Sequence, residues 1–415
     1  MVTVSFHAPN PVNLNTLSVL RRTMELNELL RRMVEAEASD LIIKSGGVPA
    51  VRVNGKIRFL ETDRVSLQEV RSYCDTFLVE ETRKIFEEYG EVDAAYHLDD
   101  SGRFRINLFR RQGEIGVVFR YIKDEIPSFA ELNLPVHALQ RLSLLPRGLV
   151  LITGVTGSGK STTIASMIQY INTVTQKHII TIEDPIEYQF YDKKSVISQR
   201  EIGLDTEDFA TALKYCMRQS PDVIVIGEMR DRETMEAAIN ASETGHLVLS
   251  TLHTVNAVQT IERIINLFPN EQHNLIRLQM SLNLEGVISQ RLLTRIDEEG
   301  RIPAIEIMFG TPLIREFVAE GKTKALHKAI ADEHSHYGTQ TFNQSLCELY
   351  AEGKITLEEA RAASDNPDDL ELQVRGILKG GDMSKLPGQD APEEKKRPST
   401  TARLRLGAEQ YELLD

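Results

Sequence analysis

The chain of 415 residues has no tryptophan and only three cysteines, at Cys74, Cys216 and Cys347. The cysteines are isolated and form no C-x-x-C pair, so the sequence predicts neither a disulfide framework nor a cysteine-built zinc site, and it favours a reducing compartment. Positive charge is also scarce, because the formal net charge is −13. An acidic chain of this kind is a poor match to proteins that coat nucleic acid or anionic membranes.

Long apolar runs are missing as well. No stretch reaches the length of about 18 residues that a membrane-spanning helix needs, and the N-terminus has no secretory signal pattern. We therefore expect a cytoplasmic protein that meets a membrane only through partners. The hydrophobic fraction of 41% is ordinary for a globular protein, and the length allows two or three domains.

The first part of the chain predicts an extension over residues 1–23 and then an α+β domain over 24–127. An Asn-Gly pair at 54–55 indicates a hairpin turn between two of its strands. The periodicity of apolar residues predicts helices over 24–34 and 66–90, and strands over 41–44, 50–53, 56–59, 103–109 and 116–120.

A second domain is predicted over residues 128–379, in the α/β class. It begins with a helix at about 129–144, and helical periodicity follows its last strand to about residue 379. Helical segments separate mostly apolar runs, which is the pattern of a parallel sheet covered on both faces; these strands lie over 148–153, 178–182, 222–226 and 246–251.

Residues 380–415 are rich in proline, glutamate, lysine and serine, and they predict a disordered tail. The end of this tail, 404–414, has two readings, a short partner-binding helix or a frayed terminus, of which the second is favoured.

A phosphate-binding loop is the most specific motif of the chain. It lies between the first strand and the first helix of the parallel sheet and fits G-x-x-x-x-G-K-[ST]: Gly154, Val155, Thr156, Gly157, Ser158, Gly159, Lys160 and Ser161, with Thr162 next in the helix. The glycines let backbone N–H groups surround phosphates, the lysine reaches the β and γ oxygens, and the serine hydroxyl meets Mg²⁺. The sequence therefore predicts binding of a nucleoside triphosphate, ATP, with Mg²⁺.

Carboxylates follow two neighbouring strands of the same sheet. Glu183, Asp184 and Glu187 follow the second strand, where an α/β sheet opens to its ligand, and Glu228 follows the third. Glu228 is a candidate to orient or deprotonate an attacking water, and Glu183 and Asp184 are possible Mg²⁺ ligands. Gly227 stands where the usual strand-end aspartate of a Walker B motif would be. The alternative for each carboxylate is a solvated loop acid.

Histidines and arginines complete the candidate site. His246 and His253 flank the fourth strand and are placed to sense the terminal phosphate. Arg105, Arg120 and Arg263 are candidates to bring positive charge to the triphosphate, within one subunit or across an interface. The alternatives are structural histidines and surface arginines.

Four ordered motifs resemble those of the secretion-superfamily ATPases. They correspond to a Walker A motif, an Asp box, an atypical Walker B motif and a His box, at 154–162, 181–187, 221–231 and 244–254. The stretch 227–231 and Ala38-Ser39-Asp40-Leu41 are similar to the type IV pilus retraction branch, the PilT and PilU family of twitching-motility ATPases. The resemblance covers about 24–379.

The resemblance implies a homo-hexameric ring whose subunits have a PAS-like N-terminal domain and a RecA-like P-loop ATPase domain. By motif position, Lys160 and Ser161 would bind phosphate and Mg²⁺, Glu228 would be the catalytic glutamate, and Glu187 would assist. His246 and His253 would sense the nucleotide state. Arg105 and Arg120 would be interdomain arginines, and Arg263 would be a further one by analogy.

Function follows from the same resemblance. The ring would use ATP to drive pilus retraction at the inner-membrane base of the machine, acting on a platform protein. The absence of a four-cysteine zinc module favours retraction over pilus assembly. Residues 324–330 depart from an Ala-Ile-Arg-Asn-Leu-Ile-like helix of the main retraction motor. With 340–346 and the tail beyond 380, this resembles the accessory type, which works beside a main retraction ATPase ring.

Two alternatives remain open. One is a nucleotide-binding accessory ring subunit whose own hydrolysis is weak or dispensable. The other is a RecA-like translocase of nucleic acid, which the net charge of −13 and the lack of aromatic residues in basic stretches disfavour, so we expect no nucleic-acid partner.

Overall fold

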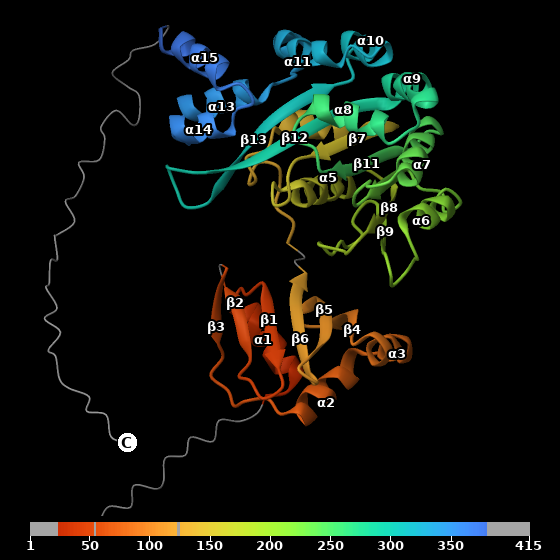
Figure 1. The fold of residues 1–415 in the computed structure, drawn as a ribbon, viewed down its shortest axis with the longest axis vertical. Coiled ribbons are helices and arrows are strands. Elements are labelled where there is room, and N and C mark those ends of the chain that lie inside the picture. The colour runs from red at the N-terminus through yellow and green to blue at the C-terminus, as the bar shows by residue number, and fades with distance from the viewer. Residues whose placement is uncertain (1–23, 54, 123–124, 380–415) are drawn as a thin grey trace, which may run out of the picture. The chain divides into compact units, whose positions relative to one another are not determined.

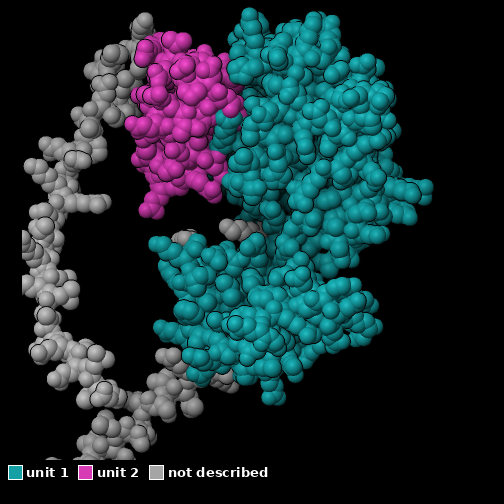
Figure 2. All heavy atoms as spheres, viewed as in Figure 1, with its two compact units in different colours: residues 1–291, 305–340 teal, residues 292–304, 341–415 magenta. Residues whose placement is uncertain are grey.

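The computed structural model describes residues 24–53, 55–122 and 125–379. They divide into two compact units: unit 1 contains the residues up to Arg291 together with Ile305–Gln340, and unit 2 contains Leu292–Ala304 together with the residues from Thr341 on (Figure 2). Across the described ranges, no helix is both long and apolar enough to cross a membrane. The expectations for 1–23, 380–415 and the 404–414 helix lie outside the described residues.

The N-terminal part of unit 1 is built on an antiparallel sheet of six strands in the order β3-β2-β1-β6-β5-β4 (Figure 1). Helix α1 (Leu26–Glu35) buries Leu26, Leu29, Leu30 and Met33, whose spacing puts them on one face. The strands are β1 (Asp40–Lys44), β2 (Ala50–Val53), β3 (Lys56–Phe59), β4 (Glu91–Leu98), β5 (Gly102–Arg111) and β6 (Glu114–Ile122).

The structure corrects three expectations for this part. The single helix expected over 66–90 is two helices, α2 (Leu67–Phe77) and α3 (Glu80–Tyr89), because Leu78 and Val79 are extended and the Thr82 hydroxyl caps the second helix at the Val79 N–H. Strand β4 was not predicted. The helix expected from about 129 is α4 (Val136–Ser143), which starts only after Pro135.

The second part of unit 1 is built on a sheet of seven strands in the order β13-β12-β7-β11-β10-β8-β9. Every strand pair from β12 to β9 along this order is parallel, which confirms the predicted parallel core. The strands are β7 (Gly148–Thr153), β8 (His178–Glu183), β9 (Val196–Glu201), β10 (Val223–Ile226), β11 (Leu247–Leu252), β12 (Leu284–Thr294) and β13 (Arg301–Phe309).

Helices connect and cover these strands, and the sheet is buried between them: β7, β10 and β11 are buried along their whole length. Such strands read as continuous apolar runs, which is why the sequence identified them. The helices are α5 (Lys160–Val174), α6 (Phe209–Cys216), α7 (Arg232–Glu243), α8 (Ala257–Asn266), α9 (His273–Asn283), α10 (Pro312–Glu320), α11 (Thr323–Asp332) and α12 (His334–Tyr337), with a short 3₁₀ turn at Asn270–Gln272.

The expectation of continuous helical periodicity to residue 379 is wrong for β12 and β13. Strand β13 is buried at every position after Arg301, and a fully buried strand cannot be told from a buried helix by periodicity alone. Strand β12 pairs in parallel with β7, and its Ser289 lies opposite Thr153, the last residue before the phosphate loop. This strand therefore belongs to the framework of the site.

Unit 2 combines the distal ends of β12 and β13 with three helices, α13 (Phe342–Ala351), α14 (Leu357–Ala363) and α15 (Pro367–Lys379). Leu293, Ile302 and Ala304 from the strands share one apolar core with Phe342 and Leu346 of α13. Thr341 and Thr356 cap α13 and α14 with their side chains.

Candidate functional site

The phosphate loop lies between β7 and α5, at the carboxyl edge of the parallel sheet, where α/β proteins bind ligands. Gly157 and Gly159 have φ angles of 79° and 93°, which are accessible to glycine and costly for other residues. The N-terminus of α5 points its free N–H groups and its positive dipole end at this loop. The predicted loop thus has the backbone of an anion-binding site.

Lys160 is turned onto the loop. Its Nζ donates to the carbonyl oxygens of Gly154 at 2.9 Å and Val155 at 3.1 Å, and the residue is only 7% exposed. Burial lowers the pKa of Lys160, and the nearby charge of Glu187 partly opposes this. The hydroxyl of Ser158 in the loop is buried without a hydrogen-bond partner.

Strand β12 packs against this loop and the start of α5, a contact that no motif of the sequence predicted. The Thr153 hydroxyl donates to the Ser289 hydroxyl at 2.9 Å, and the Gln290 amide donates to the Thr163 hydroxyl of α5 at 2.8 Å. A Cβ atom on Gly154 would lie 2.6 Å from the Gln290 carbonyl oxygen, so glycine is required there. The available signal in the sequence is the polar pair Ser289-Gln290 directly after the apolar residues Val287 and Ile288.

Glu228 lies just after β10 and is held by two neighbours. His253 Nε2 is 3.1 Å from one carboxylate oxygen, and Arg230 pairs with the other. Burial lowers the pKa of His253, and the charges of Lys160 and Arg230 lower it further. A neutral His253 therefore donates to the Glu228 carboxylate, and the charge on Lys160 is close enough to act on His253.

The three carboxylates after β8 differ in environment. Glu183 accepts hydrogen bonds from Thr181 at 2.6 Å and from Gln199 at 3.2 Å, and burial raises its pKa to about 7 in spite of them. Asp184 and Glu187 are exposed. Glu187 acts electrostatically on Lys160, so the Asp-box carboxylate and the loop lysine belong to one site.

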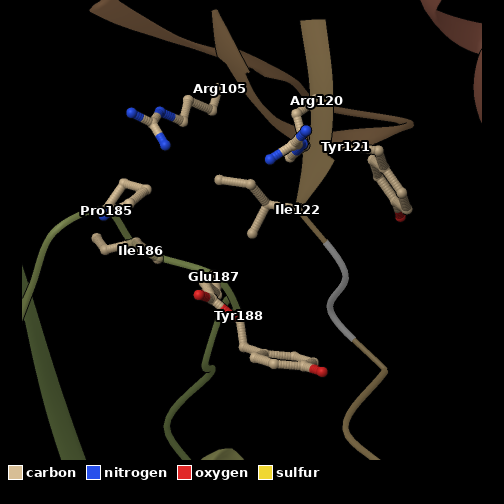
Figure 3. Close-up of a pocket in the computed structure, with 8 residues that line it drawn as sticks. All are labelled: Arg105, Arg120, Tyr121, Ile122, Pro185, Ile186, Glu187 and Tyr188. Atoms are coloured by element: carbon tan, nitrogen blue, oxygen red, sulfur yellow. The ribbon is translucent and has the colours of Figure 1, made fainter. Parts of the chain in front are cut away.

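Arg105 and Arg120 line a cavity of about 310 Å³ with Glu187 and Tyr188 (Figure 3). Both arginines are already paired on their own sheet. Arg105 lies 3.4 Å from Asp93, and Arg120 Nε donates at 2.9 Å to Asp40, the buried aspartate of the Ala38-Ser39-Asp40-Leu41 motif. The Tyr188 hydroxyl is 2.9 Å from that of Thr162 in α5.

The structure gives two predicted residues, His246 and Arg263, no contact with the loop among the residues it describes. His246 precedes β11 and its carbonyl oxygen accepts from the N–H of Gly148, the first residue of β7, so it lies at the edge of the sheet opposite the loop. Its Nδ1 is 3.0 Å from the Ala241 carbonyl oxygen. Arg263 is exposed in the last turn of α8.

The residues present fit a magnesium ion that arrives with a triphosphate. Ser161, near the start of α5, offers a hydroxyl oxygen, and the Glu187 carboxylate is close enough to act electrostatically on the adjoining Lys160. Mg²⁺ prefers oxygen ligands and keeps contact with substrate phosphates. The described part of the chain holds no group of three or more His, Cys, Asp or Glu side chains able to bind a metal ion by themselves.

A strand, a glycine-rich loop with its lysine, a helix and strand-end carboxylates on a parallel sheet define a P-loop nucleotide-binding protein. The chain belongs to the Type II/IV secretion system protein family, whose model matches residues 23–373.

The chain is similar to two proteins of Pseudomonas aeruginosa. It is 42% identical to the type IV pilus ATPase PilU over 85% of this chain and 92% of that protein. It is 41% identical to the type IV pilus retraction ATPase PilT over 84% of this chain and all of that protein. A crystal structure of the pilus retraction motor PilT with bound ADP superposes with a TM-score of 0.78 at 44% identity, over 84% of this chain and 100% of that one.

Proposed function

We propose that this protein is an ATP-hydrolysing motor of type IV pilus retraction. The observation that carries the proposal is the arrangement of Lys160, His253 and Glu228 around the phosphate loop in a chain that matches the retraction ATPases along most of its length. The protein would act in the cytoplasm as a homo-hexameric ring at the inner-membrane base of the pilus machine. There it would act on a platform protein and beside a main retraction ATPase.

ATP would bind with its phosphates in the loop over 154–162. Lys160 would leave the carbonyl oxygens of Gly154 and Val155 and turn to the β and γ oxygens. Ser161, with Asp184 or Glu183 as further candidates, would hold Mg²⁺, which supplies charge neutralisation at the phosphates. The buried charge of Lys160 would thus have oxygen partners both before and after the nucleotide binds.

Glu228 would orient the attacking water and accept its proton, the role of a strand-end carboxylate in phosphoryl transfer. His253 holds the carboxylate through its hydrogen bond. It would report loss of the γ-phosphate, because burial and then the charges of Lys160 and Arg230 already lower its pKa. Glu187 would assist from the Asp box through its field on Lys160.

Arg105 and Arg120 would supply positive charge to the triphosphate on closure of the N-terminal domain over a nucleotide, of its own or of a neighbouring subunit. Each would first have to leave its carboxylate partner, Asp93 or Asp40. His246 lies at the edge of the sheet opposite the loop and Arg263 is exposed on α8, so we expect their contribution to come across a subunit interface. Domain closure coupled to hydrolysis would provide the mechanical step.

A nucleotide-binding accessory ring subunit, whose own hydrolysis is weak or dispensable, stays the second candidate. The difference at 324–330 does not separate the subtypes by itself. Helix α10 carries Leu313-Ile314-Arg315-Glu316-Phe317-Val318, which has isoleucine, arginine and an apolar pair at the spacing of the Ala-Ile-Arg-Asn-Leu-Ile pattern. Arg315 donates to the carbonyl oxygens of Ser281 and Leu282 at the end of α9, so this stretch has a defined place in the fold.

The test is Mg²⁺-dependent ATP turnover of the purified protein, with the mass in solution measured in the same buffer. Glu228→Gln should lower kcat by about 100-fold or more and keep nucleotide binding, because it removes the base and preserves the shape. Lys160→Ala should abolish both binding and turnover. Glu236→Gln is the matched control, since Glu236 is an exposed glutamate of α7.

Turnover by a hexamer that is lost in Glu228→Gln would support an autonomous motor. Binding without turnover would support the accessory reading. Normal hydrolysis by the folded Lys160→Ala protein would overturn the assignment of the site.

A further inference from the structure

A chain of buried polar groups runs from the phosphate loop to the start of α8. Thr153, at the end of β7, donates to Ser289 of β12 at 2.9 Å, and the Ser289 hydroxyl lies 3.3 Å from Glu306 of β13, to which it donates. The same Glu306 oxygen, Oε2, accepts from the backbone N–H of Ala257 at 2.6 Å. Each of these four residues is at most 1% exposed.

Glu306 is an unusual residue for this position. A carboxylate is costly to bury, and it persists only where hydrogen bonds and positive charge compensate it. Here it sits at the first residue of α8, where the free N–H groups and the dipole of the helix favour negative charge. Asn256 already caps this helix through the N–H of Gln259, so a second cap is not required for the helix to form.

The two ends of this row of hydrogen-bonded groups lie in different segments of the candidate site. Thr153 precedes Gly154, the first residue of the phosphate loop, whereas Ala257 follows the His-box loop that carries His253 and begins the helix that carries Arg263. Strand β12 also contacts the residues between His253 and α8 directly, since Arg291 donates to the Val255 carbonyl oxygen at 3.3 Å. The connection therefore joins the loop that would hold phosphate to the segment that would respond to it.

We propose that Ser289 and Glu306 are positioning residues that couple the state of the phosphate loop to the position of helix α8. The inference rests on the proposed binding of nucleotide at the loop. Neither residue touches the reacting atoms. A shift at the carboxyl end of β7 would move the Thr153 hydroxyl, and Ser289 would pass this shift to Glu306 and to the buried N–H of Ala257, because close-packed interiors transmit displacement. A nucleotide would in this way set the orientation of Arg263.

Amide hydrogen exchange of the full-length protein, with and without a saturating non-hydrolysable ATP analogue and Mg²⁺, tests the coupling. In the wild type the nucleotide should slow exchange both in the phosphate loop with α5 and in α8. In Ser289→Ala the slowing in the loop and α5 should remain, and the slowing in α8 should be lost. Turnover of the same variant should show kcat lowered on the order of tenfold, with KM for ATP within about twofold.

Ser242→Ala is the matched control. Ser242 is also fully buried, but its hydroxyl donates within α7 to the Ile239 carbonyl oxygen, away from the loop. It should leave the α8 response and kcat unchanged. Glu306→Gln is the second variant. It keeps the shape and an acceptor for the Ala257 N–H but removes the negative charge, so it should reduce the α8 response. Ser289→Thr keeps the hydroxyl and should behave as the wild type.

An α8 response of equal size in Ser289→Ala and the wild type would overturn the coupling while leaving nucleotide binding intact. So would an α8 that does not respond to nucleotide in the wild type although the loop does. If the loop itself showed no protection, the proposed function would fail, and the coupling would fail with it.

Discussion

The charged residues of the candidate site are each compensated inside the fold. Lys160 binds loop carbonyl oxygens, Glu228 lies between His253 and Arg230, and Arg105 and Arg120 lie against aspartates of their own sheet. The shifted pKa values have the same origin, since burial and neighbouring charge act on Lys160, His253 and Glu183 together. Three groups of the candidate site therefore have shifted pKa values, which is a common property of active sites.

Glu183 should make stability depend on pH in an identifiable way. Its pKa is raised to about 7 by burial, so the folded protein holds a proton there that the unfolded chain releases above a pH of about 4.3. The stabilisation relative to Glu183→Gln is complete below that pH and is lost as the pH rises through about 7. Between pH 4.5 and 8 the free energy of unfolding of the wild type should fall, relative to the variant, on the order of 2–3 kcal/mol.

Urea unfolding of both proteins across this pH range measures the effect. The exposed control Glu236→Gln should track the wild type throughout. A constant difference between the wild type and Glu183→Gln across the range would mean that Glu183 does not titrate with the folding transition.

At the scale of elements, the phosphate loop depends on β12 as much as on its own residues. Gly154 has a φ of 146°, and a Cβ atom there would lie 2.4 Å from the Ser158 hydroxyl and 2.6 Å from the Gln290 carbonyl oxygen. Gly154→Ala should therefore displace the loop from β12. The dissociation constant for fluorescent ADP should rise about tenfold or more, the equivalent of about 1.4 kcal/mol.

Gly203→Ala separates backbone strain from this crowding. Gly203 has a φ of 82° but faces open space in the turn after β9. The variant should lose some stability and bind ADP as the wild type does. Equal loss of binding in both variants would argue that close approach to β12 is unimportant.

How much could be predicted depended on the kind of element. Strands β7, β10 and β11 were found because they are unbroken apolar runs, and the loop was found because its chemistry fixes its spelling. Strands β12 and β13 were missed because their burial hides the period of two, and the break between α2 and α3 depends on a single side-chain cap at Thr82. The second layer of the site, Ser289, Gln290 and Glu306, depends on strand order, which no local pattern encodes.

At the scale of the whole molecule, unit 2 is assembled from two distant pieces of chain. The strand segment 292–304 contributes Leu293, Ile302 and Ala304 to a core that α13 and α15 complete with Phe342, Leu346 and Leu370. A truncation after Gln340 removes the helices and leaves these strand residues facing water. Contiguous exposed apolar surface of this kind promotes aggregation.

We expect a chain ending at residue 340 to be recovered in aggregates, and a chain ending at residue 379 to be soluble. The longer chain keeps each helix and strand that the structure describes, so its melting temperature should stay within about 2 °C of the full-length value. Size-exclusion chromatography and a thermal scan measure both. A soluble, monodisperse chain 1–340 would show that the unit-2 helices are dispensable for folding.

The pairing of Lys160 with the carbonyl oxygens of Gly154 and Val155 has an energetic consequence. These oxygens are competitive ligands tethered beside the site at a fixed effective concentration, and Asp93 and Asp40 play the same part for Arg105 and Arg120. If these cations bind phosphates as proposed, each new contact would be offset by a contact given up, and the net affinity for nucleotide would stay well below what the number of contacts suggests. In the proposed motor, the same carbonyl and carboxylate oxygens would take the cations back when product forms, which would favour rapid product release over tight retention.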